Sequence, residues 1–112
     1  MPDDSQSWWE EHLRETLTLA PNEELTLITA AANGDEEAKR RVVDANLRLV
    51  VNIAKTYRPV ALSFDDLVMH GTIGLMQAID RLHPDKGFRF STYAVHWIRS
   101  AMNRAIDSPQ KS

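Results

Sequence analysis

The sequence predicts an all-α fold, a compact bundle of about four to five helices. Apolar residues recur at every third or fourth position along most of the 112-residue chain, which is the period of an amphipathic helix. Capping, proline and glycine residues divide the chain into segments of helical length. No segment alternates apolar and polar residues in the way that is typical of a strand.

The first two helices are expected in the N-terminal third of the chain. An amphipathic segment runs from about Ser7 to Leu19. Pro21 can open the second helix as its first residue, because the first N–H groups of a helix are unpaired in any case. Asn33-Gly34 is a stop signal, and Asp35 can cap a third helix.

The third helix is expected to be central. Apolar residues recur from Val42 to Tyr57 and form a band wide enough to contact neighbours on more than one side. Pro59 should end this helix, because the residue before a proline is disfavoured in helical geometry.

The fourth helix should begin at Ser63-Phe64-Asp65-Asp66, which resembles a capping box with Asp in place of the usual Glu. Its apolar stripe continues to Leu82. Gly71 and Gly74 lie inside it, and each costs up to about 1 kcal/mol relative to alanine. Their presence predicts a close contact with another helix.

The last helix follows a turn at residues 83–87. Ser91 or Thr92 can cap it, it runs to about Ile106, and Ser108-Pro109 ends it. The chain is therefore divided into an acidic arm at residues 1–20, a helical domain at 21–108 and a tail at 109–112.

Length and composition exclude several classes of protein. A chain of 112 residues allows one domain. It has no apolar run of the roughly 20 residues that a bilayer requires, and its N-terminus lacks the features of a signal peptide. Without cysteine it has no disulfide framework, thiol nucleophile or cysteine-based zinc site. We therefore expect a cytoplasmic protein with no membrane partner.

The formal charge of −3 conceals a division along the chain. Residues 1–37 hold ten acidic residues and one basic residue, a balance of −9. Residues 38–112 hold twelve bases and six acids, a balance of +6. This asymmetry is consistent with a basic surface for an acidic partner such as nucleic acid, and equally with two solvated faces of unequal charge.

The sequence offers little support for catalysis. Its four histidines are scattered, and it has neither an HExxH motif nor a glycine-rich phosphate loop. Asp66 and His70 have the i, i+4 spacing of half a metal site, but a surface ion pair or a partner contact is the simpler interpretation. The sequence shows no general base that could activate a hydroxyl of Ser91-Thr92, so these residues are interpreted as a helix cap. We expect neither an enzyme nor a metal or cofactor site.

The segment Gly87–Arg99 is the most informative part of the chain. It holds half of the eight aromatic residues, interleaved with a histidine, arginines and small hydroxyl residues. Aromatic rings stack on unpaired bases while Arg and Lys hold phosphates, so the pattern suits single-stranded nucleic acid. The alternative is that Phe88, Phe90 and Trp97 are core anchors, as large aromatics usually are.

Two segments, Gly87–Arg99 and Ala45–Tyr57, together resemble the second conserved region of bacterial sigma-70 family initiation factors. Asp66-Leu67 and Ile73–Ala78 resemble the segment that lies between these motifs in the family. The likeness covers about residues 21–106. The resemblance implies the helical fold of sigma region 2 and a role in transcription initiation, without enzymatic activity.

The resemblance also implies a DNA-binding surface. In the family this domain binds the promoter −10 element and captures flipped non-template bases, so Tyr93 would stack on a flipped adenine. His96 and Trp97 stand where the family often has two Trp that wedge against the upstream duplex edge. Ser100 and Asn103 occupy the positions that read the last upstream base pair. The residues assigned to DNA in this way are Asn46, Arg48, Leu49, Lys86, Phe88, Arg89, Phe90, Ser91, Thr92, Tyr93, His96, Trp97, Arg99, Ser100, Asn103 and Arg104.

A protein partner is implied as well. In the family the segment between the two motifs docks on the clamp helices of the RNA polymerase β′ subunit. Many members read Gln-Glu-Gly-Asn where this chain has residues 69–72, so an acid has become His70. This departure puts the strength of docking or the choice of partner in doubt. The residues assigned to polymerase are Asp65, Asp66, Met69, His70, Thr72 and Met76.

Two alternatives to a complete initiation factor stay open. The family usually continues past Ile106 into domains that bind the −35 element, so the chain is expected to be a fragment of a longer factor or, alternatively, a natural single-domain member. The altered residues 69–72 and this early end also allow a sigma-like decoy, which would bind polymerase or a regulator, such as an anti-sigma factor, without opening DNA.

Overall fold

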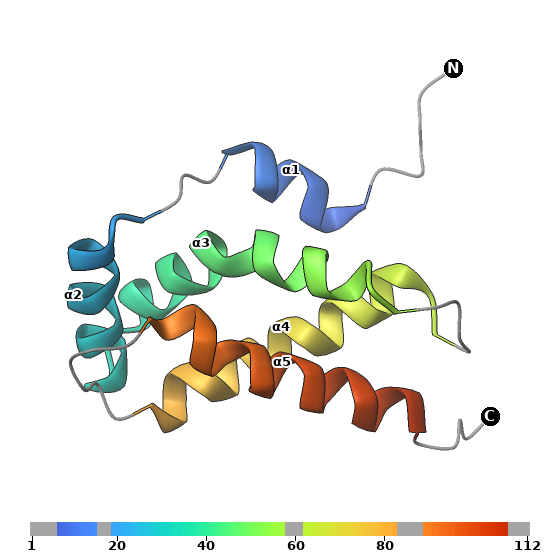
Figure 1. The fold of residues 1–112 in the computed structure, drawn as a ribbon. Coiled ribbons are helices and arrows are strands. Elements are labelled where there is room, and N and C mark those ends of the chain that lie inside the picture. The colour runs from blue at the N-terminus through green and yellow to red at the C-terminus, as the bar shows by residue number, and fades with distance from the viewer. Residues whose placement is uncertain (1–6, 16–18, 58–61, 83–88, 108–112) are drawn as a thin grey trace.

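Five helices make up the described part of the protein, a computed structural model that describes residues 7–15, 19–57, 62–82 and 89–107 (Figure 1). No strand occurs in these ranges, which confirms the all-α class. The helices are α1 (Trp8–Glu15), α2 (Pro21–Ala32), α3 (Glu36–Ala54), α4 (Phe64–Arg81) and α5 (Phe90–Asp107).

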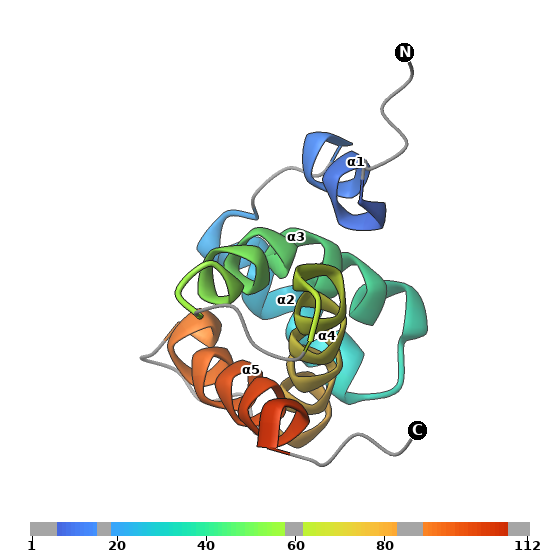
Figure 2. The same ribbon diagram turned by 90° about the vertical axis from the view of Figure 1, so that its right-hand side faces the viewer.

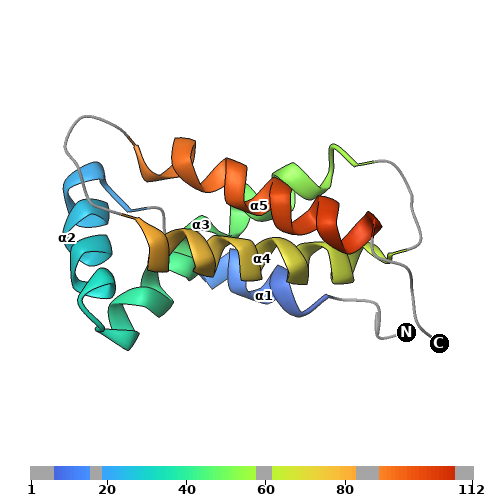
Figure 3. The same ribbon diagram turned by 90° about the horizontal axis from the view of Figure 1, so that it is seen from below.

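Helices α3, α4 and α5 pack on one another and enclose the core, while α2 crosses one end of them (Figures 1 and 3). Helix α1 lies on the other side of α3 from α5 (Figure 2). The core is mainly apolar, and its largest fully buried side chains are Val42, Val50, Val51, Val68, Leu75, Ile79, Ile98 and Met102. Helix α3 contacts all four other helices, as its wide apolar band predicts.

The two glycines of α4 allow the neighbouring helices α3 and α5 to approach closely, as predicted. A Cβ atom added at Gly71 would lie 2.8 Å from Val50 Cγ1, and one added at Gly74 would lie 2.9 Å from Ala101 Cβ. Both distances are shorter than real contacts of a Cβ atom allow. An alanine at Gly71 would displace side chains of α3 and α5, whereas one at Gly74 would meet the backbone of α5 and push the two helices apart.

Local signals set most of the helix starts. Glu23 accepts a hydrogen bond from the N–H of Ala20 at 3.1 Å before α2. Asp35 caps α3 by accepting from the Ala38 N–H at 3.1 Å, and Ser63 caps α4 by accepting from the Asp66 N–H at 3.1 Å.

Glycine is needed at the turn between α2 and α3. Gly34 has a φ of 100°, in the left-handed region that other residues avoid. Its N–H donates to the carbonyl of Ala31, and the next N–H, of Asp35, donates to that of Ala30, each at 3.0 Å. The predicted stop signal therefore acts as a helix C-cap.

Three predicted helix limits are wrong. The first helix was expected to run to about Leu19, but Leu19 is not helical; α1 is described as far as Glu15, and residues 16–18 lie outside the described residues. Helix α3 ends at Ala54, short of Tyr57, because the Thr56 N–H and hydroxyl both bond to the Ile53 carbonyl, which tightens the chain into a turn.

The third wrong limit is the start of the last helix. Ser91 and Thr92 lie in its first turn instead of capping it, because the helix already includes the buried Phe90. The Thr92 N–H bonds to the Arg89 carbonyl at 3.2 Å. The predicted turn at residues 83–87 lies outside the described residues.

Candidate nucleic-acid interface

One face of α5 carries the largest group of residues assigned to DNA. Six of them recur at three- or four-residue steps and so share one side of the helix: Tyr93, His96, Trp97, Ser100, Asn103 and Arg104. We call this set the α5 stripe. The opposite side of α5 is held in the core by Ala94, Ile98 and Met102, each fully buried. Packing of the inner face therefore points the stripe outward.

An aromatic and cationic cluster lies within the α5 stripe. The rings of Tyr93 and Trp97 are tilted by 55° with their centres 6.2 Å apart. The guanidinium carbon of Arg81, at the end of α4, lies 5.7 Å from the centre of the Trp97 ring. This cation–π contact fixes part of the Trp97 surface and adds a positive charge beside it. Arg81 was not among the predicted residues, because only the packing of α4 on α5 brings it there.

A second missed residue, Tyr57, meets the stripe near its C-terminal end. It follows the last turn of α3, and its hydroxyl donates a hydrogen bond to Asn103 Oδ1 at 2.9 Å. Its only sequence signal was its place at the end of the Ala45–Tyr57 motif.

The assigned residues around the start of α5 differ in their exposure and contacts. Phe90 is 3% exposed and packs in the core, as the core-anchor alternative expects. Ser91 is half-buried and Thr92 is exposed. Arg89 is exposed, and its Nε lies 3.7 Å from a carboxylate oxygen of the buried Glu24 on α2, so its charge is partly offset. Lys86 and Phe88 lie outside the described residues.

Along the flank of the stripe, Arg99 is exposed like its neighbour Ser100. Between Lys86 and Arg104 the sequence has four bases and no acid. The stripe and its flank are therefore cationic, aromatic and hydroxyl-bearing, which is the chemistry that binds a single strand of nucleic acid.

The three assigned residues of α3 do not extend the stripe. Asn46 is buried, and its Nδ2 donates to the Val42 carbonyl at 2.8 Å. Arg48 is exposed, but its Nη2 lies 3.4 Å from the Leu13 carbonyl of α1, which it approaches as a donor. Leu49 is half-buried.

The residues assigned to polymerase lie mainly along an exposed face of α4. Asp65, Met69, Thr72 and Met76 follow one another at helical spacing. Met69 and Met76 are 44% and 40% exposed, and Ile73, which was not assigned, is 44% exposed beside them. Asp66 is exposed and His70 is half-buried. An exposed apolar row of this kind is typical of a surface that another protein covers.

Helix α1 is fastened to the N-terminal end of this α4 face. One carboxylate oxygen of Asp65 accepts hydrogen bonds from Ser7 Oγ at 2.6 Å and from Trp9 Nε1 at 2.9 Å. The Trp9 ring meets Phe64 edge-on, with ring centres 5.6 Å apart. The acidic arm is thus partly a docked helix, and nothing in its local sequence indicated Asp65 as the acceptor.

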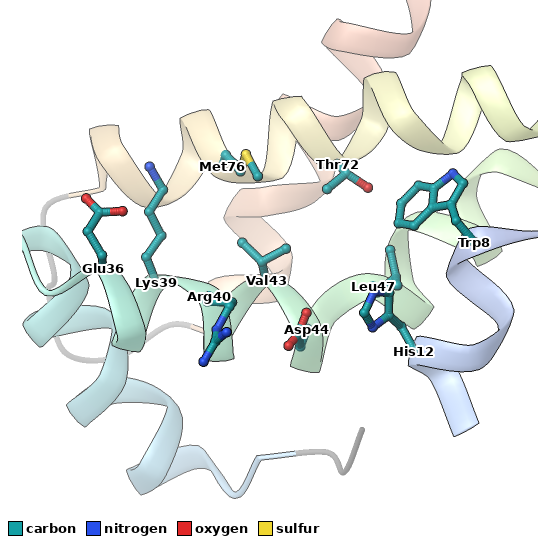
Figure 4. A pocket seen from close by; sticks show the side chains of 10 residues that line it. All are labelled: Trp8, His12, Glu36, Lys39, Arg40, Val43, Asp44, Leu47, Thr72 and Met76. Carbon is teal, nitrogen blue, oxygen red and sulfur yellow. The ribbon is translucent and has the colours of Figure 1, made fainter. Parts of the chain in front are cut away.

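A groove of about 560 Å³ is lined by residues of α1, α3 and α4 (Figure 4). Thr72 and Met76 of the α4 face line it, and Trp8 and His12 of α1 line one end of it. Its remaining lining residues come from α3: Glu36, Lys39, Arg40, Val43, Asp44 and Leu47.

Neighbouring charges compensate the two cations of the groove. Lys39 Nζ lies 2.8 Å from Asp80 of α4. A hydrogen bond from Arg40 to Glu37, together with the charge of that carboxylate, raises the pKa of Arg40. The groove therefore has little net charge, and a bound partner would meet mainly its apolar surface.

The described residues provide neither a metal centre nor a membrane span. No three histidine or acidic side chains among them gather closely enough to hold a metal ion. None of the five helices is both long and apolar enough to cross a bilayer.

Comparison with known proteins gives a consistent result. The family model described as sigma-70 region 2 matches residues 42–111. Over 88 residues, or 79% of the chain, the protein is 51% identical to the RNA polymerase sigma factor SigA of a Bacillus species, 48% to that of Clostridium acetobutylicum and 50% to that of Listeria monocytogenes. The match covers 23%, 23% and 24% of these three relatives. The chain therefore spans about a quarter of their length.

Proposed function

Because this chain belongs to the sigma-70 family, whose region 2 it carries, we propose that it acts in transcription initiation by binding the promoter −10 element. In this proposal the α5 stripe captures non-template bases that flip out as the duplex opens. The α4 face docks on the clamp helices of the RNA polymerase β′ subunit. The protein acts in the bacterial cytoplasm as a binding module and not as an enzyme.

The α5 stripe is the observation that carries the DNA-binding part. Extruding a base costs a few kcal/mol, which stacking and hydrogen bonds must recover. Tyr93 and Trp97, tilted against each other, offer aromatic surface for stacking. Arg99 and Arg104 are exposed on α5 and supply charge for the phosphates. Buried Phe90 would support this surface from below without touching a base.

The polymerase-binding part is supported by the exposed apolar row of α4. Met69, Ile73 and Met76 would lose most of their exposed surface under a partner helix. Asp65 would act by holding α1 and the residue before it, because it accepts hydrogen bonds from Ser7 and Trp9. Asp66 is exposed and can accept hydrogen bonds from a basic partner.

The DNA-binding part can be tested with fluorescence anisotropy on a single-stranded TATAAT-like oligonucleotide and its scrambled version. We expect selective binding that weakens as salt rises from about 50 to 200 mM, because bound phosphates release counterions. Tyr93→Ala should weaken binding by about 5- to 150-fold, the value of one stacked base. Trp8→Ala is the matched control, since Trp8 is an exposed aromatic on α1, away from α5. Equal binding of the two oligonucleotides would contradict a direct promoter role.

Docking can be tested separately by capture of the chain on an immobilised β′ clamp-helix fragment. Met76→Ala and Asp66→Ala should reduce capture, whereas Thr26→Ala, an exposed change on α2, should not. Capture without selective DNA binding would favour the sigma-like decoy. Capture that Asp66→Ala and Met76→Ala leave unchanged would mean that the α4 face is not the docking surface.

A further inference from the structure

The hydrogen bond between Tyr57 and Asn103 has a consequence for base-pair selection. It joins the turn after α3 to the exposed C-terminal half of the α5 stripe, with 2.9 Å between the phenol oxygen and Asn103 Oδ1. The turn itself is tied down, because the Tyr57 N–H bonds to the Ala54 carbonyl at 3.1 Å and the Thr56 N–H to that of Ile53 at 2.9 Å. The Tyr57 ring is itself partly buried and packs against the core, so its hydroxyl is held in place beside Asn103.

An asparagine side chain has two chemically opposite ends. Its oxygen accepts hydrogen bonds, and its NH2 group donates them. In Asn103 the oxygen is the end that bonds to Tyr57. A phenol donates more readily than it accepts, so it favours the amide orientation in which the oxygen faces the ring. The NH2 group is then the end available to a bound molecule.

Base edges in the major groove distinguish these two ends. Guanine presents only acceptors there, O6 and N7, whereas cytosine presents the N4 amino donor. An outward NH2 group pairs with the guanine edge and meets another donor at cytosine. A freely rotating asparagine could turn its oxygen to cytosine and lose this discrimination.

We propose that Tyr57 is a positioning residue that holds Asn103 with its amide NH2 group outward, so that the pair favours guanine over cytosine at the base-pair edge that Asn103 faces. This inference rests on the proposed function and on the resemblance, by which Asn103 occupies a position that reads the last upstream base pair of the −10 element. Tyr57 selects through Asn103 and does not itself touch the base.

The experiment uses the 112-residue chain and two fork-junction DNAs with the same TATAAT-like single-stranded overhang. The two forks differ only in the orientation of one pair, G·C or C·G, at the last base pair before the overhang. Their composition is equal, so the ratio of the two dissociation constants reports how the edge is read. The wild-type chain should prefer one orientation by about 2- to 12-fold, the range expected for one net hydrogen bond.

Three variants separate the possible explanations. Tyr57→Phe keeps the ring but removes the donor, so the ratio should fall close to one while affinity for the overhang alone stays unchanged. Asn103→Asp replaces the outward donor by an acceptor, so the preferred orientation should reverse. Asn103→Ala should abolish the preference. Thermal unfolding of each variant shows whether the fold is kept.

The outcomes also separate this inference from the proposed function. A wild-type ratio of one, or a ratio that Tyr57→Phe leaves unchanged, overturns the inference even when the overhang is bound selectively. If Asn103→Asp loses the preference while Tyr57→Phe behaves like the wild type, Asn103 selects the base pair without Tyr57. This result also overturns the inference. Failure to distinguish the TATAAT-like overhang from a scrambled one overturns the proposed function, and the inference with it.

Discussion

The close crossing of α4 and α5 can be tested by Gly74→Ala. The added Cβ atom would lie 2.9 Å from Ala101 Cβ and 3.0 Å from the Trp97 carbonyl carbon, with the Trp97 carbonyl oxygen nearer still. Two of these three atoms belong to the backbone of α5 and cannot rotate away. The helices must therefore move apart, or α5 must shift as a whole.

The magnitude follows from two opposing effects. Overpacking a core costs about 1–3 kcal/mol, and the upper end applies because backbone atoms resist the new methyl group. Replacing a helical glycine by alanine returns up to about 1 kcal/mol. The free energy of unfolding should therefore fall by about 2 kcal/mol, which for a domain of this size lowers Tm by roughly 8 °C.

Urea unfolding followed by circular dichroism measures this change, provided that the free energy of unfolding falls with urea concentration at the same slope in the variant and the wild type. Ile73→Ala is the matched control, because Ile73 is the preceding residue of α4 and is 44% exposed; its effect should stay within about 0.5 kcal/mol. Ala101→Gly removes one of the close neighbours, so the double variant should lose less than the sum of the single variants. A Gly74→Ala protein as stable as the control would refute the close approach.

Three further perturbations test other contacts. Trp9→Phe keeps the ring but removes the donor to Asp65, so amide hydrogen exchange in α1 should speed up about tenfold, as expected for the lower end of a hydrogen bond to a charged group; unchanged protection would mean that this bond does not hold α1. Glu24→Gln removes the charge 3.7 Å from Arg89, so the log–log salt slope of oligonucleotide binding should steepen by about 0.7 if one more phosphate is engaged; the same slope before and after would show that Arg89 reaches no phosphate. Asp35→Ala removes the α3 cap and should cost about 1 kcal/mol in urea unfolding, which Asp35→Asn should largely restore; an equal loss in both variants would contradict capping as the cause.

Prediction from sequence succeeded where the signal was local. Asp35 and Ser63 cap the helices that they were expected to cap, and Gly34 ends α2. Each signal depends on residues within one turn of the helix. The prediction failed at Ala54, where a hydroxyl bond to a carbonyl one turn away ended α3 well before the proline that was expected to do so.

For the candidate site, the α5 stripe was foreseeable because its spacing follows the helical period. The hydrogen-bond partners of the stripe and of the α4 face were not foreseeable. Tyr57 lies 46 residues from Asn103, and Trp9 lies 56 residues from Asp65. The burial of Asn46 against the Val42 carbonyl was equally invisible, because a polar side chain in a helix can face either way.

The acidic arm shows the same distinction. Its negative charge was plain in the sequence, but its docking through Ser7 and Trp9 on the α4 face was not. Composition and spacing account for the all-α class, for most helix limits and for the outward side of α5. The way in which the helices cross accounts for the contacts of Asn103, Asp65 and Arg48, because such contacts join distant segments and depend on the packed core, not on the local period of any one helix.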